Sequence, residues 1–337
     1  MTPAISTIRS PWTFRDLLGA WKARWGLGRM GYRVLPGLYA LNTPSPDSPV
    51  LVSANYKMSF DLLRRAMAGR PAWLLVIDTK GINVWCAAGK GTFGTAEIVR
   101  RVRETDLASA VTHRRLIVPQ LGAPGTAAHT VRAETGFSVV YGPVRAADLP
   151  AFLDAGCRTD AAMRTATFTF RERWVLVPVE VVGAAVPALT AAALALLLSG
   201  LTRHGYSLDA VRTTGLLSIS LLCMALLSGA VLTPLFLPRI PGRAFAVKGA
   251  LTGGLGVALL WLLSAHFQAL SGIDKAAWSL MIPAFSSFLA MNFTGATPFT
   301  SLSGVLKEMR LAVPLQAGAA GLGIILWIAG RFIGRGI

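Results

Sequence analysis

Long apolar stretches fill the second half of the sequence, and this feature limits the possible folds more than any other. Five such stretches occur, at residues 174–199, 211–237, 246–267, 276–293 and 311–333. A helix needs about 20 mostly apolar residues to cross a bilayer, and each stretch reaches or approaches that length. The fourth is the least apolar, because Ser286, Ser287 and Asn292 interrupt it. The sequence therefore predicts an all-α transmembrane domain of about five helices in residues 171–337.

The first half of the chain differs in composition. Only 15% of the 337 residues are charged, whereas an average soluble domain carries about 25%. The deficit falls in the second half, so we expect a soluble domain at 46–170 ahead of the membrane domain. Residues 1–45 are basic and Arg and Lys interrupt any apolar core, which is a poor pattern for a signal peptide. We interpret them as an arm on the surface of the domain or of the membrane.

Strand-like and helix-like patterns alternate in the soluble half. Apolar β-type runs occur at 50–54, 72–77, 116–118 and 138–140, and helical patterns at 59–67, 96–102, 126–134 and 148–155. This alternation predicts an α/β fold, a Rossmann-like parallel sheet with helices on both faces. Ligands of such sheets bind beyond the carboxyl ends of the strands. Those ends are predicted at 53–55, 78–83, 120–124 and 141–143.

One cysteine follows the second predicted strand, within the sequence GINVWCAAGKGTFGT at residues 81–95. Asn83 is a good helix N-cap, because its side-chain oxygen accepts a bond from an orphan backbone N–H. Cys86 would then occupy the third helical position, where backbone N–H groups and the helix dipole favour a thiolate. The glycines at 89, 91 and 94 would let a large flat ligand approach the backbone.

Three other interpretations of this segment compete with a ligand site. Cys86 could be a small buried hydrophobic residue, and this alternative stays open. A P-loop is excluded, because Lys90 is followed by Gly91 rather than Ser or Thr. A thioredoxin-like pair needs a second cysteine at position 89, which is glycine. The cysteines at 86, 157 and 223 show no CxxC spacing, so they predict neither a zinc site nor an iron–sulfur cluster. They are odd in number and far apart, which argues against a disulfide framework and indicates a reducing compartment.

The octapeptide NVWCAAGK, Asn83 to Lys90, resembles the signature of the corrinoid protein of microbial mercury methylation (HgcA type). The resemblance extends over nearly the whole chain and includes PVLVSAN at 49–55, SFD at 59–61, DTKG at 78–81, PQLGAP at 119–124 and YGPVR at 141–145. It implies a corrinoid-binding domain related to the large subunit of the corrinoid iron–sulfur protein of acetyl-CoA synthesis. That relative lacks the cysteine at the equivalent place.

The resemblance also implies an activity. The expected cofactor is a cobalamin-type corrinoid, with Cys86 as the lower axial ligand of its cobalt. The expected reaction transfers a methyl group from cobalt to Hg(II) and forms methylmercury. The implied partners are a ferredoxin-like protein with two four-iron clusters and a folate-linked methyl donor system. The residues expected around the cofactor are Ser53, Asn55, Ser59, Thr79, Gly81, Asn83, Val84, Trp85, Cys86, Ala87, Ala88, Gly89, Lys90, Gly91, Thr92 and Gly142.

The net charge of +17 is typical of a protein with an anionic partner. No helix-turn-helix, zinc-finger or RNA-binding motif accompanies it, so we expect an anionic membrane surface rather than nucleic acid. A small excess of Lys and Arg in alternate loops predicts a multi-pass protein of the inner membrane with a cytoplasmic N-terminal domain. The polar stretch 292–304 (NFTGATPFTSLSG) is either a loop rich in turn-forming residues or a docking surface.

Two alternative functions remain open at this point. The first is a membrane-anchored corrinoid methyl carrier of one-carbon metabolism whose acceptor is not mercury. The second is a membrane transporter or metal-binding protein, which would be expected to place cysteine pairs or acidic residues at mid-membrane.

Overall fold

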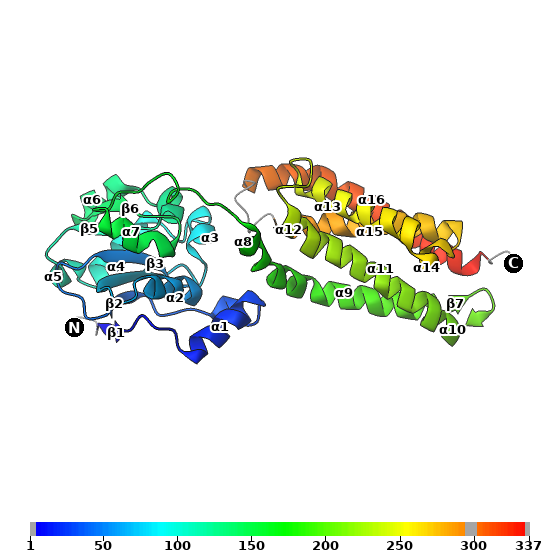
Figure 1. Ribbon diagram of the computed structural model, residues 1–337, viewed down its shortest axis with the longest axis horizontal. Helices are drawn as coiled ribbons and strands as arrows, with labels where there is room; N and C mark the ends of the chain where they lie inside the picture. Colours follow the sequence, from blue (N-terminus) through cyan, green and yellow to red (C-terminus); the bar gives the residue numbers. More distant parts are fainter. Residues whose placement is uncertain (1–4, 294–301, 334–337) are drawn as a thin grey trace. The chain divides into compact units, whose positions relative to one another are not determined.

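The computed structural model describes residues 5–293 and 302–333, which divide into two compact units (Figure 1). Unit 1 ends at Thr167 and unit 2 begins at Phe168. Most of the polar stretch predicted as a loop or docking surface at 292–304 lies outside the described residues.

Unit 1 is an α/β unit. Its strands are β1 (Ser6–Ile8), β2 (Gly37–Leu41), β3 (Val50–Ala54), β4 (Ala72–Ile77), β5 (Arg115–Val118) and β6 (Ser138–Tyr141). Its α-helices are α1 (Phe14–Arg24), α2 (Lys57–Ala66), α3 (Val84–Gly89), α4 (Thr95–Glu104), α5 (Leu107–Ala110), α6 (Ala128–Thr135) and α7 (Leu149–Asp154). The 3₁₀ helices are η1 (Arg29–Gly31), η2 (Gln120–Gly125) and η3 (Ala146–Asp148).

The sheet of unit 1 has six strands in the order β1-β2-β4-β3-β5-β6. The four predicted strands are confirmed as β3 to β6, and neighbours among them pair in parallel. A purely parallel sheet is wrong, however, because β2 pairs antiparallel with β4 and β1 pairs parallel with β2. The sheet is therefore mostly parallel, with one antiparallel junction.

The interpretation of residues 1–45 as a separate arm needs a corresponding correction, because this segment supplies β1 and β2 to the sheet. The run GLYAL of β2 is short and follows a stretch of Arg, Trp and Gly, so its apolar signal is weak. Its register aligns Leu38 with Leu75, which covers the edge of β4 that would otherwise be unpaired.

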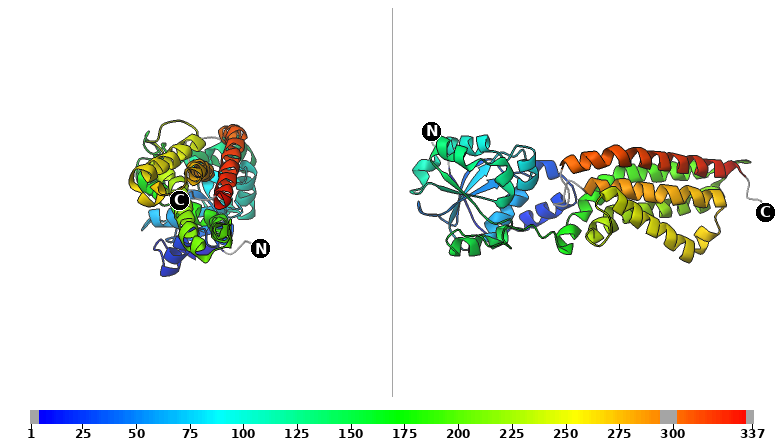
Figure 2. Two further views of the ribbon diagram at one scale, coloured as in Figure 1. Left: turned by 90° about the vertical axis from the view of Figure 1, so that its right-hand side faces the viewer. Right: turned by 90° about the horizontal axis from the view of Figure 1, so that it is seen from above.

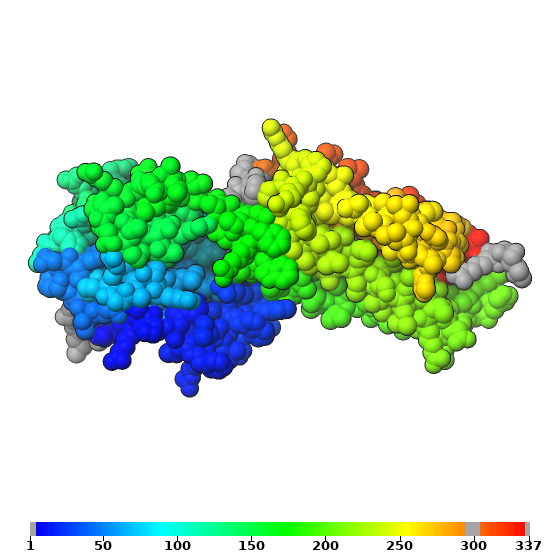
Figure 3. All heavy atoms as spheres, in the orientation of Figure 1, coloured from blue at the N-terminus to red at the C-terminus, as the bar shows by residue number. Residues whose placement is uncertain are grey.

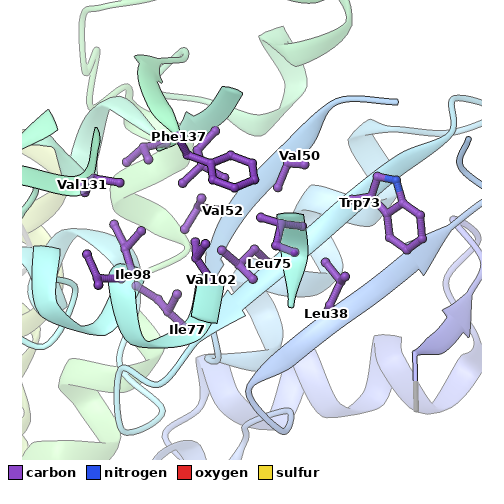
Figure 4. Close-up of a cluster of buried hydrophobic side chains, with 14 of the residues drawn as sticks. Leu38, Val50, Val52, Trp73, Leu75, Ile77, Ile98, Val102, Val131 and Phe137 are labelled. Atoms are coloured by element: carbon purple, nitrogen blue, oxygen red, sulfur yellow. The ribbon is translucent and has the colours of Figure 1, made fainter. Parts of the chain in front are cut away.

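Helices cover both faces of this sheet, as predicted (Figure 2). On one face Val52, Leu75 and Ile77 pack against Ile98 and other apolar residues of α4 and α6 (Figure 4). On the other face α2 and α7 cover Leu51, Leu74 and Val76. Central strands buried on both faces explain why β3 and β4 appear in the sequence as continuous apolar runs rather than alternating ones.

Unit 2 is almost entirely helical. Its α-helices are α8 (Phe170–Trp174), α9 (Val177–Ser199), α10 (Leu208–Ala210), α11 (Leu216–Leu226), α12 (Thr233–Phe236), α13 (Phe245–Leu263), α14 (Ala265–Gln268), α15 (Gly272–Asn292) and α16 (Leu302–Phe332). The π-helical segments η4 (Val211–Gly215) and η5 (Leu227–Leu232) connect α10, α11 and α12, and a short hairpin joins β7 (Leu201–Thr202) to β8 (Gly205–Tyr206).

Four helical segments of the described chain are long and apolar enough to cross a membrane: 170–199, 208–236, 245–263 and 304–332. The fourth predicted span, 276–293, forms a helix, α15, but does not belong to this set. Its polar residues have a structural reason, because α15 packs between α13 and α16 (Figure 1). Ser286 Oγ donates to Ala225 O (3.1 Å), and Ser287 Oγ donates to Ala246 O (2.8 Å). A helix enclosed by other helices can carry polar groups that a lipid-facing helix could not.

Candidate functional site

The strand order predicts a crevice beyond the carboxyl ends of two central strands, β3 and β5. The chain passes from β3 to β4 on one side and then to β5 on the other side of β3, so the connections diverge between β3 and β5. Ligands of doubly wound sheets bind at such a point, beyond the carboxyl ends of the strands. A cavity of about 310 Å³ lies there, lined by the ends of β3, β5 and β6 and by residues of α2 and α3. The predicted site residues that line this cavity are Ser53, Ser59, Asn83, Val84, Trp85 and Gly142.

Asn55 holds the turn that leads from β4 to α3. Its Oδ1 accepts hydrogen bonds from Thr79 N (3.1 Å), Thr79 Oγ1 (2.9 Å) and Gly81 N (2.9 Å). Its Nδ2 donates to Asp78 Oδ1 (3.1 Å). Lys80 and Gly81 both have positive φ, 58° and 74°, so the turn needs this support. Because the polar atoms of Asn55 and Thr79 are engaged inside the protein, the structure gives these two predicted site residues a positioning role.

The helix that carries Cys86 begins as predicted. Asn83 is the N-cap of α3, and its Oδ1 accepts a hydrogen bond from Cys86 N (2.9 Å) at the third helical position. The other end of α3 has a Schellman cap, in which Thr92 N donates to Ala87 O (2.9 Å) and Gly91 N donates to Ala88 O (3.3 Å). Gly91 has a φ of 76°, which the cap requires. The cap alone therefore accounts for this glycine, and a ligand is not needed to explain it.

A second segment, η2, braces the inner side of α3. Phe93 is fully buried, and a Cβ at Gly125 would lie 2.0 Å from Phe93 O. A Cβ at Gly122 would lie 2.4 Å from the Phe93 ring. Only glycine at both positions allows this contact between the loop after β5 and the loop after α3. None of these three residues is among the predicted site residues, although the two glycines around Pro124 were a usable signal.

The outer side of α3 is open. Ala87 and Ala88 are buried, Cys86 is half-buried, and Trp85 is 40% exposed. Gly89 is exposed, and a Cβ there would meet nothing within 4 Å. Cys86 and Gly89 are three residues apart, so they share one face of the helix. All three cysteines are free, and no hydrogen bond to the Cys86 thiol is found among the described residues.

An ion-pair cluster lies behind the turn, on α1 and α2. Asp16 Oδ1 and Oδ2 each lie 2.6 Å from a cation, Lys57 Nζ and Arg64 Nη2 respectively. Asp61 pairs with the same two cations at 2.7 and 2.9 Å. Burial alone would raise the pKa of Asp16, but hydrogen bonds from Lys57, Thr13 and Arg64 hold it well below its usual range.

Tyr32 belongs to the same cluster. Burial and the negative charges of Asp61 and Asp16 raise the pKa of its phenol. Tyr32 follows η1, and a Cβ at Gly81 would lie 3.1 Å from Met30 O in η1. The N-terminal segment therefore packs directly against the β4–α3 turn and supports it from behind.

The described residues contain no group of three or more His, Cys, Asp or Glu side chains that could hold a metal ion by themselves. Fold and site together define unit 1 as an α/β domain with a strand-end cavity beside a doubly capped turn of helix that presents one thiol.

Comparison with known proteins shows which proteins this domain is similar to. The family model described as "CO dehydrogenase/acetyl-CoA synthase delta subunit" matches residues 28–153, within unit 1. The acetyl-CoA decarbonylase/synthase complex subunit gamma of Methanopyrus kandleri is 34% identical over 147 residues, 43% of this chain and 31% of that protein.

Two further relatives give the same picture. The subunit gamma of Archaeoglobus fulgidus is 31% identical over 128 residues, which are 37% of this chain and 27% of that protein. The corrinoid/iron-sulfur protein large subunit of Moorella thermoacetica is 29% identical over 125 residues, 36% of this chain and 28% of that protein. The chain thus spans less than a third of the length of these relatives.

Proposed function

We propose that unit 1 binds a corrinoid and that the protein is a membrane-associated corrinoid methyltransferase. The name of the Moorella relative, a corrinoid/iron-sulfur protein, supports the cofactor. The single structural observation that carries the proposal is the Cys86 thiol, half-buried on the open face of α3 at the ligand-binding edge of the sheet.

The glycine at position 89 is consistent with a flat cofactor bound against the open face of α3. Gly89 is the last residue of α3, and alanine favours a helix more than glycine does. No described neighbour explains the choice at Gly89, since a Cβ would meet nothing within 4 Å. A flat macrocycle lying against this face would explain it, because it would approach the backbone beside the Cys86 thiol. The adjacent cavity of about 310 Å³ would accept only an appended group of the cofactor.

The chain's own residues then have distinct roles. Cys86 would ligate the cobalt through its sulfur, since a thiolate is a soft, electron-rich ligand. Asn83 caps the start of α3, and its Oδ1 accepts a hydrogen bond from Cys86 N. Asn55 holds the turn just before Asn83 and so positions the start of the helix. Trp85 lines the cavity and would exclude water from one side. When bound, the corrinoid supplies the cobalt that carries the methyl group between donor and acceptor.

We propose Hg(II) as the acceptor, because the octapeptide at 83–90 resembles the signature of the mercury-methylation family and its cysteine is present. The names of the relatives concern acetyl-CoA complexes and favour the alternative more directly, a corrinoid methyl carrier with another acceptor. The methyl donor is proposed to be a folate-linked system, and the reductant a ferredoxin-like protein with two four-iron clusters.

Methylmercury formation in cells that carry the protein and its ferredoxin partner tests the proposal. Cys86→Ala should abolish the product, and Cys86→His should retain the cofactor but lose most of the transfer if an electron-rich thiolate is needed. Histidine is larger, and overpacking costs about 1–3 kcal/mol, so folding is measured in parallel. Cys157→Ala and Cys223→Ala are matched controls and should leave the reaction nearly unchanged. Full activity in Cys86→Ala would contradict the proposed ligand, and wild-type corrinoid binding without methylmercury would favour the other acceptor.

We also propose that unit 2 lies in the inner membrane and that unit 1 is cytoplasmic. The four spans and the bias of Lys and Arg between loops support this arrangement. If α15 crosses with the others, reporter fusions at Gly205 and Ser303 should give opposite signals. Identical signals at the two positions would mean that α15 does not cross.

A further inference from the structure

Helix α1 carries its largest side chains on the side that faces away from unit 1. The outward residues are Phe14, Leu17, Leu18, Trp21 and Trp25, the last at the C-cap. Phe14 is 77% exposed and Trp21 is 53% exposed. Their spacing of three, four and seven residues places them in one stripe along the helix. Residues 5–36, drawn in dark blue, lie at the surface of unit 1 (Figure 3).

The inward side of α1 is small and polar instead. Its buried residues are Asp16, Ala20 and Ala23. Asp16 is held by the ion pairs to Lys57 and Arg64 described above, and a Cβ at Gly19 would lie 2.6 Å from the Tyr32 ring. Alanines and ion pairs therefore fasten α1 to unit 1, whereas a helix of a water-soluble domain normally buries its apolar stripe.

Basic residues border the outward stripe. At 100° per residue, Arg15 and Lys22 lie on one flank of the stripe and Arg24 lies on the other. Residues 5–36 contain six basic side chains and one acidic side chain, Asp16, a difference of +5. Asp16 faces inward and is already paired, so the outward side of this segment is strongly positive.

A stripe of exposed aromatic and aliphatic residues marks an interaction site on a soluble domain. Aromatic residues beside Lys and Arg flanks are typical of helices that lie in the membrane interface. The positive flanks complement anionic headgroups. The chain also enters the first candidate span at Phe170, three residues after unit 1 ends at Thr167, which keeps unit 1 beside that membrane.

We infer that α1 docks on the anionic surface of the bilayer that holds unit 2, with its apolar stripe in the interface and its basic flanks at the headgroups. The inference rests on the membrane placement proposed above, and it adds that unit 1 binds lipid through a surface of its own. Docking requires no rearrangement of α1, because the ion pairs and small residues already present the stripe outward.

The test uses the full chain in nanodiscs, with its native cysteines replaced by alanine. A fluorophore is attached at Leu17→Cys in the stripe, and at Arg103→Cys as the matched control. Arg103 is an exposed residue of α4. Helix α4 packs on one face of the sheet, whereas α2, which contacts α1, packs on the opposite face. Spin-labelled lipids report the proximity of each fluorophore to the bilayer. We expect strong quenching at position 17 and little at position 103, in discs of phosphatidylcholine with phosphatidylglycerol.

A second variant tests the charge requirement. Arg15→Glu with Lys22→Glu changes only exposed side chains, so the fold should be preserved. Each basic residue near an anionic surface shifts the ratio of bound to unbound helix about fivefold, so the pair should lower the quenching at position 17 markedly. When Arg15 and Lys22 are kept, discs of phosphatidylcholine alone, or high salt, should also lower the quenching at position 17.

Two outcomes would overturn the inference. In one, positions 17 and 103 are quenched equally in discs that retain the protein. In the other, position 17 is shielded from aqueous iodide but not quenched by lipid, which would identify a protein as the occupant. If the discs do not retain the protein at all, the membrane placement of unit 2 fails together with this inference, while corrinoid binding by unit 1 is read separately, from the absorption of the protein that keeps its native cysteines.

Discussion

The two units orient their large apolar side chains in opposite directions. In unit 1, Leu75 and Ile77 are fully buried between the sheet and its helices. In unit 2, Leu189 and Leu262 are at least 70% exposed, while Ser286 is fully buried. We therefore expect water around unit 1 and lipid around unit 2, since lipid tails are as apolar as leucine. Helix α1 belongs to unit 1 by position but follows the pattern of unit 2, which is why we assign it to the membrane surface.

The largest difference between the units is expected for identical substitutions at a buried and an exposed leucine. Leu75→Ala should lower the unfolding free energy of unit 1 by about 2–5 kcal/mol, because it leaves a cavity in a packed core. Leu262→Ala should change the stability of unit 2 by less than about 0.5 kcal/mol, because lipid fills the space. Urea titration of the full chain in nanodiscs, read by proteolysis of each unit, measures both. Equal losses would mean that unit 2 does not face lipid at Leu262.

At the candidate site of unit 1, a buried polar side chain should matter according to the hydrogen bonds that it makes. Asn55→Ala removes the acceptor of three hydrogen bonds from the β4–α3 turn. Leaving such donors unpaired costs about 1–3 kcal/mol, and the turn should loosen and weaken corrinoid uptake. Ser53→Ala is the control, because within the described part of the chain the Ser53 hydroxyl donates to the adjacent Ala54 O and not to the turn. Hydrogen exchange at residues 78–83 reports the turn, and equal protection in the two variants would remove the positioning role of Asn55.

Two adjacent glycines of α13 offer a matched pair in unit 2. A Cβ at Gly253 would lie 2.8 Å from Pro283 Cα in α15, whereas a Cβ at Gly254 would meet nothing within 4 Å. Gly253→Ala should therefore destabilise the bundle by about 1 kcal/mol through overpacking. Gly254→Ala should be neutral or slightly stabilising, because alanine favours helix. Thermal unfolding in nanodiscs would show this difference, and the opposite order would contradict the packing of α13 on α15.

The smallest expected effect concerns pH and the attachment of α1. The pKa of Asp16 is lowered in the folded protein, so the carboxylate favours folding above the unfolded value of about 3.9. That contribution is lost progressively as the pH falls below about 4 towards the lower folded value. The hydrogen-exchange protection factors of α1, which are corrected for the intrinsic pH dependence of exchange, should therefore fall in acid. Asp16→Asn should loosen α1 already at pH 7 and should remove much of the dependence; an unchanged profile would show that the ion pairs do not hold α1.

The sequence was most informative where a single interaction dominated. Continuous apolar runs located β3 and β4 because those strands are buried on both faces, and shorter apolar runs located β5 and β6. Asn83 located the start of α3 because N-capping is local. The strand β2 was missed because its partner, β4, is remote in sequence and its own pattern is weak.

Other features depend on contacts that no local pattern contains. The outward stripe of α1 was not recognised, because a helix period does not reveal which side faces the protein. The polar residues of α15 weakened its assignment as a span, yet their partners lie on neighbouring helices. At the site, Gly91 was expected to admit a ligand but serves a helix cap, and only Gly89 remains without an internal explanation.

The absorption spectrum of the purified full chain, loaded with corrinoid, tests the central claim most directly. We predict that the wild-type protein binds the corrinoid with the cofactor's own nucleotide base displaced from cobalt, and that Cys86→Ala changes the spectrum because the sulfur ligand is lost. Cys157→Ala should leave the spectrum unchanged. No uptake of corrinoid, a spectrum with the base still bound to cobalt, or identical spectra for wild type and Cys86→Ala would contradict the assignment of Cys86 as the cobalt ligand.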